Sequence, residues 1–272
     1  MRESTVCYSV LFTLLAVSSS THASPPTFKY VTSYVPNGKY IQISEIQKNT
    51  VNVLQPLIFI INENDNPNAS QDLVAQYLDR QINNVFVVDW NQADATSTRT
   101  ACSDVGDFIT TVFNKTGEQY LNVHLVGVLT GAGVAAGAAQ RVRESSLKIN
   151  RITALDPTYY SINWDAALLR GGNANLVDVV RTKFDKENET LGDVDFYVYD
   201  EECIKDETKC DKSTATKLFA QSINSDKIKA IKCDSLIDFQ SGTCSKSGKI
   251  TFGENVPRDI KGKYFLKKLN KF

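Results

Sequence analysis

Short apolar runs alternate with longer segments in which hydrophobic residues recur every three or four positions. The runs Leu57–Ile61, Val85–Val88 and Ile152–Leu155 are mostly or wholly apolar, as expected for strands that are buried on both faces. The segments Asp72–Asn83 and Asp104–Asn114 place their hydrophobic residues along one helical stripe. This alternation predicts an α/β fold, with a mostly parallel central sheet and helices on both of its faces.

Other segments carry weaker patterns. Thr27–Tyr40 is polar and aromatic without a clear period, so we expect only edge strands there. Asn62–Asn68 is polar and predicts a loop, and Asp185–Asp193 predicts a charged loop. The sequence shows no internal repeat and no low-complexity linker, which favours a single domain.

A strand, a sharp turn and a helix are predicted around the centre of the chain. The apolar run Val123–Val126 ends in the turn Gly127–Gly131, and a segment rich in alanine and glycine follows. Glycines at both ends of the turn let the backbone bend where a Cβ atom would clash. This geometry lifts Leu129, the middle residue of the turn, to the top of the sheet.

The segments Val123–Gly137 and Arg151–Pro157 resemble the neutral, pancreatic-type animal lipases and phospholipases A1. The likeness extends from about Pro56 to Leu266. By size, the nearest likeness is to inactive insect members such as yolk polypeptides. The resemblance implies an α/β-hydrolase fold with a short lid. Further stretches that carry it are Val85–Trp90, Leu176–Thr182 and Gly192–Tyr197.

In these lipases the middle residue of the turn is the nucleophilic serine. Leu129 stands there in this chain, and leucine has no atom that can attack a carbonyl. The resemblance also places Lys212 on the position of the catalytic histidine, where an ammonium group beside a carboxylate is a poor base. Thr130 is interpreted as an ordinary helix-starting residue. His124, inside the strand before the turn, is interpreted as a packed structural residue.

The remaining site positions are judged in the same way. The family's oxyanion turn corresponds to Asn62, Glu63 and Asn64, and Glu63 would place negative charge where an oxyanion forms. Asp156 alone is retained, and we interpret it as a structural carboxylate at a strand end. We expect Lys212 to lie within salt-bridge reach of Asp156. The alternative is that Lys212 extends into solvent and Asp156 accepts backbone donors instead.

The N-terminus has the pattern of a secretory signal. Arg2 precedes the short apolar core Val6–Val17, and small residues at Thr21–Ala23 suit cleavage. We therefore expect a signal peptide over residues 1–23, a mature lipase-like domain over residues 24–272 without a C-terminal β-sandwich, and an extracellular protein with no transmembrane segment. Three sequons agree with export and begin at Asn68, Asn114 and Asn188.

Cysteine usage also fits an oxidising compartment. Cys7 lies in the predicted signal peptide, so five of the six cysteines remain and one must stay unpaired. The resemblance implies disulfides Cys203–Cys210, across the lid, and Cys233–Cys244. Cys102 is then a free thiol or the link of a covalent dimer. No pair has the spacing of a metal site, and we expect neither a metal nor a cofactor.

The charge of the chain limits the classes of partner that it can bind. The formal net charge is −1 and no run of basic residues occurs, which argues against nucleic acid. The predicted lid offers only Ile204 as an apolar contact, which argues against activation at a lipid interface.

The leading hypothesis is a secreted, catalytically inactive lipase homologue. It would serve as a storage protein or bind a lipid or other apolar small molecule beneath Leu129. The alternative is an active secreted lipase or phospholipase A1, a carboxylic ester hydrolase with a non-standard site. A third hypothesis is an extracellular interaction protein. The residues do not separate storage from ligand binding.

Overall fold

The computed structural model describes residues 25–63, 69–90, 95–118, 122–158, 168–184, 189–211 and 213–268. Eleven strands within these ranges form one sheet, in the order β10-β9-β11-β8-β7-β6-β5-β3-β4-β1-β2. The strands are β1 Thr27–Thr32, β2 Val35–Ile41, β3 Leu57–Glu63, β4 Val85–Trp90, β5 Val123–Val128, β6 Arg151–Leu155, β7 Leu176–Arg181, β8 Val194–Tyr199, β9 Lys229–Lys232, β10 Lys249–Thr251 and β11 Gly262–Lys267.

The described helices are interspersed between these strands. Short 3-10 turns occupy Ile43–Glu45, Glu207–Lys209 and Thr243–Lys246. The α-helices are α1 Ala69–Asp79, α2 Ala95–Thr116, α3 Gly131–Glu144, α4 Glu201–Lys205, α5 Thr214–Ile223 and α6 Leu236–Ser241.

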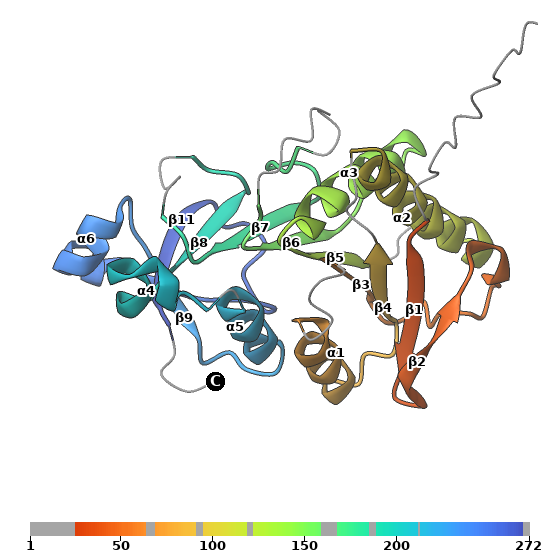
Figure 1. The fold of residues 1–272 in the computed structure, drawn as a ribbon, viewed down its shortest axis with the longest axis horizontal. Coiled ribbons are helices and arrows are strands. Elements are labelled where there is room, and N and C mark those ends of the chain that lie inside the picture. Colours follow the sequence, from red (N-terminus) through yellow and green to blue (C-terminus); the bar gives the residue numbers. More distant parts are fainter. Residues whose placement is uncertain are drawn as a thin grey trace, which may run out of the picture.

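The centre of the sheet is parallel and its two ends are antiparallel (Figure 1). Seven neighbouring strands, from β4 through β3, β5, β6, β7 and β8 to β11, run in one direction. At one end β1 and β2 are added antiparallel, and at the other end β9 and β10. The expectation of edge strands over Thr27–Tyr40 is therefore wrong for β1, which lies between β4 and β2.

Each face of the sheet is covered by its own apolar core. Along β3, Leu57, Phe59 and Ile61 belong to the core that includes α2 and α3, whereas Ile58 and Ile60 belong to the core that includes α1 and α5. Figure 1 shows these two helix pairs on opposite sides of the sheet. Successive strand residues point to opposite faces, so a strand between two helical layers is apolar at most of its positions. The predicted α/β-hydrolase fold, with a mostly parallel sheet and helices on both faces, is confirmed.

Element boundaries differ from the sequence-based expectation at three places. Helix α1 ends at Asp79 rather than Asn83, because Gln81 takes a left-handed conformation (φ 63°) and the Ile82 N–H donates back to the Tyr77 carbonyl at 3.0 Å. Helix α2 begins at Ala95, nine residues before the expected Asp104. Its first two turns carry no apolar stripe, so hydrophobic periodicity does not reveal them.

Strand β3 is also longer than expected. Asn62 and Glu63, assigned to a loop from their polarity, continue the strand and pair with Asp89 and Trp90 of β4. Strand β4 reaches as far as Trp90, so its backbone N–H and C=O groups can pair with those of Asn62 and Glu63 and extend β3.

Candidate active-site region

The predicted strand–turn–helix is present at the carboxyl end of β5. Leu129 follows β5 with a left-handed backbone (φ 52°), and α3 begins two residues later at Gly131. The Leu129 N–H donates to the Leu155 carbonyl at 2.9 Å, and this hydrogen bond fixes the turn to β6. A left-handed conformation is uncommon for leucine and costs conformational energy, so surrounding contacts must hold it.

Two glycines permit this sharp turn. A Cβ atom on Gly127 would lie 2.5 Å from Cα of Ala132, and one on Gly131 would lie 2.1 Å from the Ile61 carbonyl oxygen. Both distances are shorter than any real Cβ contact. The start of α3 can therefore approach β3 and β5 only because neither position carries a side chain.

No nucleophile is raised by this turn. The Leu129 side chain is half-buried and packs against the apolar core of the α1 and α5 face. Thr130 carries the adjacent hydroxyl, but it is buried in the N-cap position of α3, and its Oγ1 makes no hydrogen bond in the described part of the structure. Within the described residues, no base is therefore bonded to this hydroxyl.

Asp156 lies beside the turn, at the end of the neighbouring strand. Val128 pairs with Leu155, so Leu129 and Asp156 follow directly at the carboxyl ends of β5 and β6. Asp156 is also left-handed (φ 46°). Its two carboxylate oxygens accept the Thr182 N–H at 2.6 Å and the Thr182 hydroxyl at 2.8 Å.

Local donors from Thr182, the residue that follows β7, thus hold the Asp156 carboxylate, and one of them is a backbone donor, as in the alternative to the Lys212 pairing. Burial raises the pKa of Asp156 to about 6, although the Thr182 donors act in the opposite direction. Lys212 lies outside the described residues, so its pairing with Asp156 stays a prediction. The same holds for Asn64 and for the Glu63 side chain in the predicted oxyanion turn.

The raised pKa of Asp156 predicts a pH-dependent penalty on folding. The folded protein binds this proton more tightly than the unfolded chain, so the free energy of unfolding falls as pH rises from the unfolded pKa of 3.8 to the folded pKa of about 6. We expect the Asp156→Asn variant, measured by urea unfolding, to lack this fall. Its stability relative to wild type should rise by about 3 kcal/mol across that window.

Asp259→Asn, a change of the same charge at an exposed site, is the matched control and should run parallel to wild type. Parallel wild-type and Asp156→Asn curves would contradict the prediction.

His124 is the structural residue that its strand position suggested. Its ring is buried, Nε2 lies 2.8 Å from Thr153 Oγ1, and Nδ1 lies 3.5 Å from a Glu254 carboxylate oxygen. Burial, and then the charge of Arg151, lower the pKa of the imidazole well below its usual value, so the ring is neutral at pH 7. Leu129 lies five positions further along the chain, about 16 Å at the usual rise of a strand, so His124 cannot serve the turn.

Sequence reasoning missed a buried charge cluster around this histidine. Arg151 binds Asp178 through two hydrogen bonds of 2.7 and 2.8 Å, and also donates to the carbonyls of Gly253 and Glu254. Tyr77 of α1 donates to the Glu254 carboxylate at 2.9 Å. The available signal was the presence of charged residues, Arg151 and Asp178, in two mostly apolar strands, β6 and β7. The cluster joins the sheet to α1 and to the loop before β11.

Both predicted disulfides, Cys203–Cys210 and Cys233–Cys244, are confirmed. The first closes the short lid formed by α4 and the following turn, where the Ile204 side chain is exposed. Cys102 is free and fully buried in α2, and burial raises the pKa of its thiol to about 12. The folded protein gives this thiol no access to a second chain, so the structure does not support a dimer through Cys102.

The other predicted sites are tested only in part. Asn114 is exposed near the end of α2, as glycosylation requires, whereas Asn68, Asn188 and the predicted signal peptide lie outside the described residues. Within the described ranges, no group of three or more His, Cys, Asp or Glu is placed to hold a metal ion. No helix in that part of the chain has the length and hydrophobicity needed to cross a membrane.

Comparison with known proteins gives one family. A family model described as Lipase matches residues 30–267. Lipase member H of Danio rerio is 30% identical over 195 residues, which cover 63% of this chain and 42% of that protein. Lipase member H-A of Xenopus laevis is 30% identical over 223 residues, covering 72% and 47%. The chain therefore spans less than half the length of these relatives.

More distant similarity is found among solved structures. A hormone-sensitive lipase from a metagenome library is 11% identical, covers 63% of this chain and 66% of that one, and has a TM-score of 0.34.

Proposed function

The chain belongs to the lipase family, and on that premise we propose that it is a secreted member without catalytic activity. Its role is then non-enzymatic: storage, or the binding of a lipid or other apolar small molecule. In this proposal Leu129, Asp156 and Lys212 are the relict positions of nucleophile, acid and base, and Asn62, Glu63 and Asn64 are the relict oxyanion turn.

The geometry of Leu129 is the observation that carries the proposal. Acyl transfer by this fold needs a nucleophile on the strand-to-helix turn, with the oxyanion donors facing the same point. The turn is retained in detail, including its left-handed apex and its two close-packed glycines, yet an alkyl side chain occupies the apex. The turn keeps the geometry that would present a nucleophile, but its apex carries no atom that can attack an ester. Together these two features support a role other than hydrolysis.

The supply of bases supports the same conclusion. His22 lies in the predicted signal peptide, so His124 is the one histidine of the mature chain. It is buried, neutral and bonded to Thr153, and it belongs to the charge cluster instead of the turn. Asp156 is engaged by Thr182. An acid without a nucleophile and a base performs no acyl transfer.

Ester hydrolysis is the direct test. We expect the purified full chain to hydrolyse p-nitrophenyl butyrate, emulsified triolein and phosphatidylcholine no faster than a protein-free blank, because no described side chain supplies the attacking atom. Leu129→Ser should stay inactive as well, since it restores a hydroxyl without a base. Turnover that co-purifies with the protein and disappears in Thr130→Val, with stability unchanged, would overturn the proposal and favour the active esterase.

Mass spectrometry of the protein purified from its source tissue separates the two non-enzymatic roles. Storage predicts a high yield of protein without a bound molecule. Ligand binding predicts a retained apolar compound that is released on denaturation. A second measurement on the same sample, peptide mapping of the sequons, reports whether Asn114 is glycosylated.

A further inference from the structure

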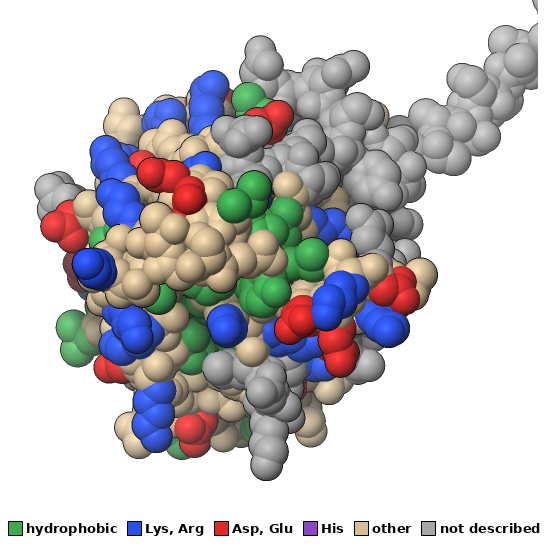
Figure 2. Space-filling model, turned by 90° about the vertical axis from the view of Figure 1, so that its left-hand side faces the viewer, with side chains coloured by type: hydrophobic (Ala, Val, Ile, Leu, Met, Phe, Trp, Pro, Cys, Tyr) green, Lys and Arg blue, Asp and Glu red, His purple; other side chains and the backbone are tan. Residues whose placement is uncertain are grey.

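A second candidate binding site lies far from the turn, at the other end of the sheet. A hollow of about 400 Å³ opens over β9, β10 and β11 beside α6. In the order of strands it is separated from β5 by β8, β7 and β6. Figure 2, which looks at the molecule from the α6 side, shows hydrophobic surface with Lys and Arg side chains around it and several Asp and Glu side chains among them.

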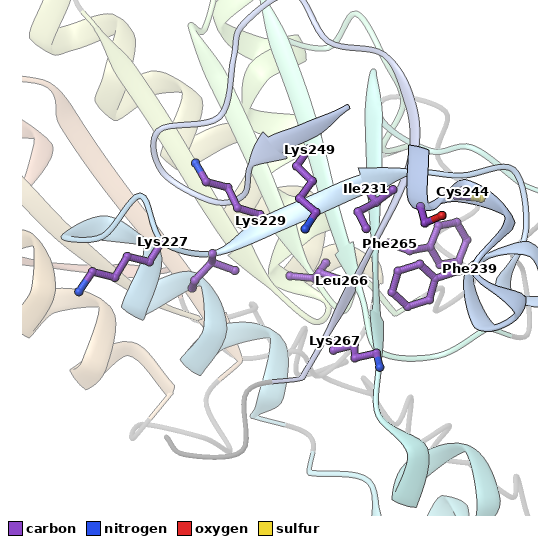
Figure 3. Close-up of a pocket in the computed structure, with 12 residues that line it drawn as sticks. Lys227, Lys229, Ile231, Phe239, Cys244, Lys249, Phe265, Leu266 and Lys267 are labelled. Carbon is purple, nitrogen blue, oxygen red and sulfur yellow. The ribbon is translucent and has the colours of Figure 1, made fainter. Parts of the chain in front are cut away.

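The inner surface of the hollow is apolar. Figure 3 shows the side chains of Phe239 and Phe265 lying together, with Ile231 of β9 beside them and Leu266 further along β11. Phe239 and Ile231 are only half-buried, although the Phe239 and Phe265 rings stack with their centroids 5.5 Å apart. Apolar side chains that line a concave surface without being fully covered by the fold are the usual lining of a ligand pocket.

Four lysines surround this apolar surface: Lys227, Lys229, Lys249 and Lys267. All four are exposed, and none forms an ion pair with a carboxylate in the described part of the chain. Lys229 Nζ donates to Thr251 Oγ1 at 2.8 Å. The pKa of Glu201 is lowered chiefly by Lys205 and in small part by Lys267, so one acidic group lies near the rim.

The surrounding segment is basic although the whole chain is not. Residues 226–268 contain ten Lys and Arg against five Asp and Glu, in a chain whose net charge is −1. Like charges gathered around one concave surface create a positive potential that attracts an anion. An apolar lining inside a cationic rim is complementary to a molecule with one apolar part and one anionic end.

We propose that this lysine-rimmed hollow binds one single-chain amphiphilic anion, a long-chain fatty carboxylate, with its carboxylate at the lysines and its chain along the half-buried side chains of Phe239 and Ile231. The volume lies toward the small end of the range of about 300–1,000 Å³ that ligand pockets occupy, which suits one acyl chain better than two. The site is independent of the relict turn, and the proposal stands whether or not the protein hydrolyses esters.

Fluorescence of a dansyl-labelled fatty acid, displaced by oleate, is the test on the full chain. We expect the probe to bind the wild type, oleate to displace it, and oleyl alcohol, with the same chain and no charge, to displace it poorly. Lys229→Gln/Lys249→Gln should weaken oleate binding about tenfold, because two charge-assisted contacts are removed. The matched control, Lys48→Gln/Lys148→Gln, removes the same charge from exposed sites elsewhere and should leave affinity unchanged.

Three results would overturn the proposal. Equal affinity in the two double variants would show that the lysines do not hold the anion. Loss of binding in Leu129→Asn, with normal binding in Lys229→Gln/Lys249→Gln, would place the ligand at the relict turn and would favour the ligand-binding form of the proposed function. Lysine-dependent sedimentation with vesicles of phosphatidylcholine and phosphatidylserine, without binding of free oleate, would identify an anionic membrane surface as the partner.

Discussion

Arg151→Met is expected to lower the free energy of unfolding by about 3–5 kcal/mol, because it leaves a buried carboxylate without its cation. The side chains of Arg151 and Asp178 are 3% and 1% exposed. After the change, the Thr153 hydroxyl still donates to Asp178, but the two guanidinium hydrogen bonds are gone and the carbonyls of Gly253 and Glu254 lose the same donor. A buried ion pair contributes little net stability, but removing one partner is costly.

A double-mutant cycle measured by urea unfolding tests the reason for this loss. Arg151→Met/Asp178→Leu should lose less stability than the sum of the two single changes, because it removes both charges together. Arg141→Met is the matched control. Arg141 pairs with Asp107 and Glu144 while its side chain is 47% exposed, so we expect a loss of less than about 1 kcal/mol. Equal losses in Arg151→Met and Arg141→Met would contradict the prediction.

Gly131→Ala is expected to destabilise the protein by at least about 3 kcal/mol, although alanine is the better helix former by about 1 kcal/mol. The new Cβ would lie 2.1 Å from the Ile61 carbonyl oxygen, a backbone atom of a buried central strand that cannot move aside. The helix must shift away from β3, which separates the packed surfaces of α3 and the sheet.

Gly248→Ala provides the comparison for this variant. A Cβ there meets nothing within 4 Å and the backbone is not left-handed, so the change should lie within about 0.5 kcal/mol of wild type. Thermal or urea unfolding of the two variants under identical conditions gives the difference. If both variants were equally stable, the close approach of α3 to β3 would be absent from the protein in solution.

The sequence by itself was sufficient for the elements whose signal is local. The apolar runs in β3, β4 and β6 were recognisable because strands covered on both faces carry few polar residues to interrupt them. The spacing of Gly127 and Gly131 indicated the turn. The sequence also showed that leucine, which has no nucleophilic atom, occupies its apex at position 129. The resemblance to lipases placed both disulfides correctly.

Elements with polar surfaces were predicted less well. The start of α2 carries no apolar stripe, and the end of β3 and the interior place of β1 depend on a neighbouring strand that supplies backbone hydrogen bonds. Periodicity reports whether a residue is covered, and it does not report by which segment.

Only the tertiary structure decided which distant residues meet. The Arg151–Asp178 pair and the Glu254 contacts to Tyr77 and His124 join residues from five separated parts of the chain. From the sequence Cys102 was a candidate cross-link, whereas the position of α2 on the sheet buries its thiol. The lysines around the hollow are scattered from Lys227 to Lys267, so no run of consecutive basic residues predicted the site. Each of these features arises when the pairing of strands, parallel and antiparallel, brings remote segments side by side. The free energy that selects this pairing comes from burial of the whole core. No local sequence pattern contains that information.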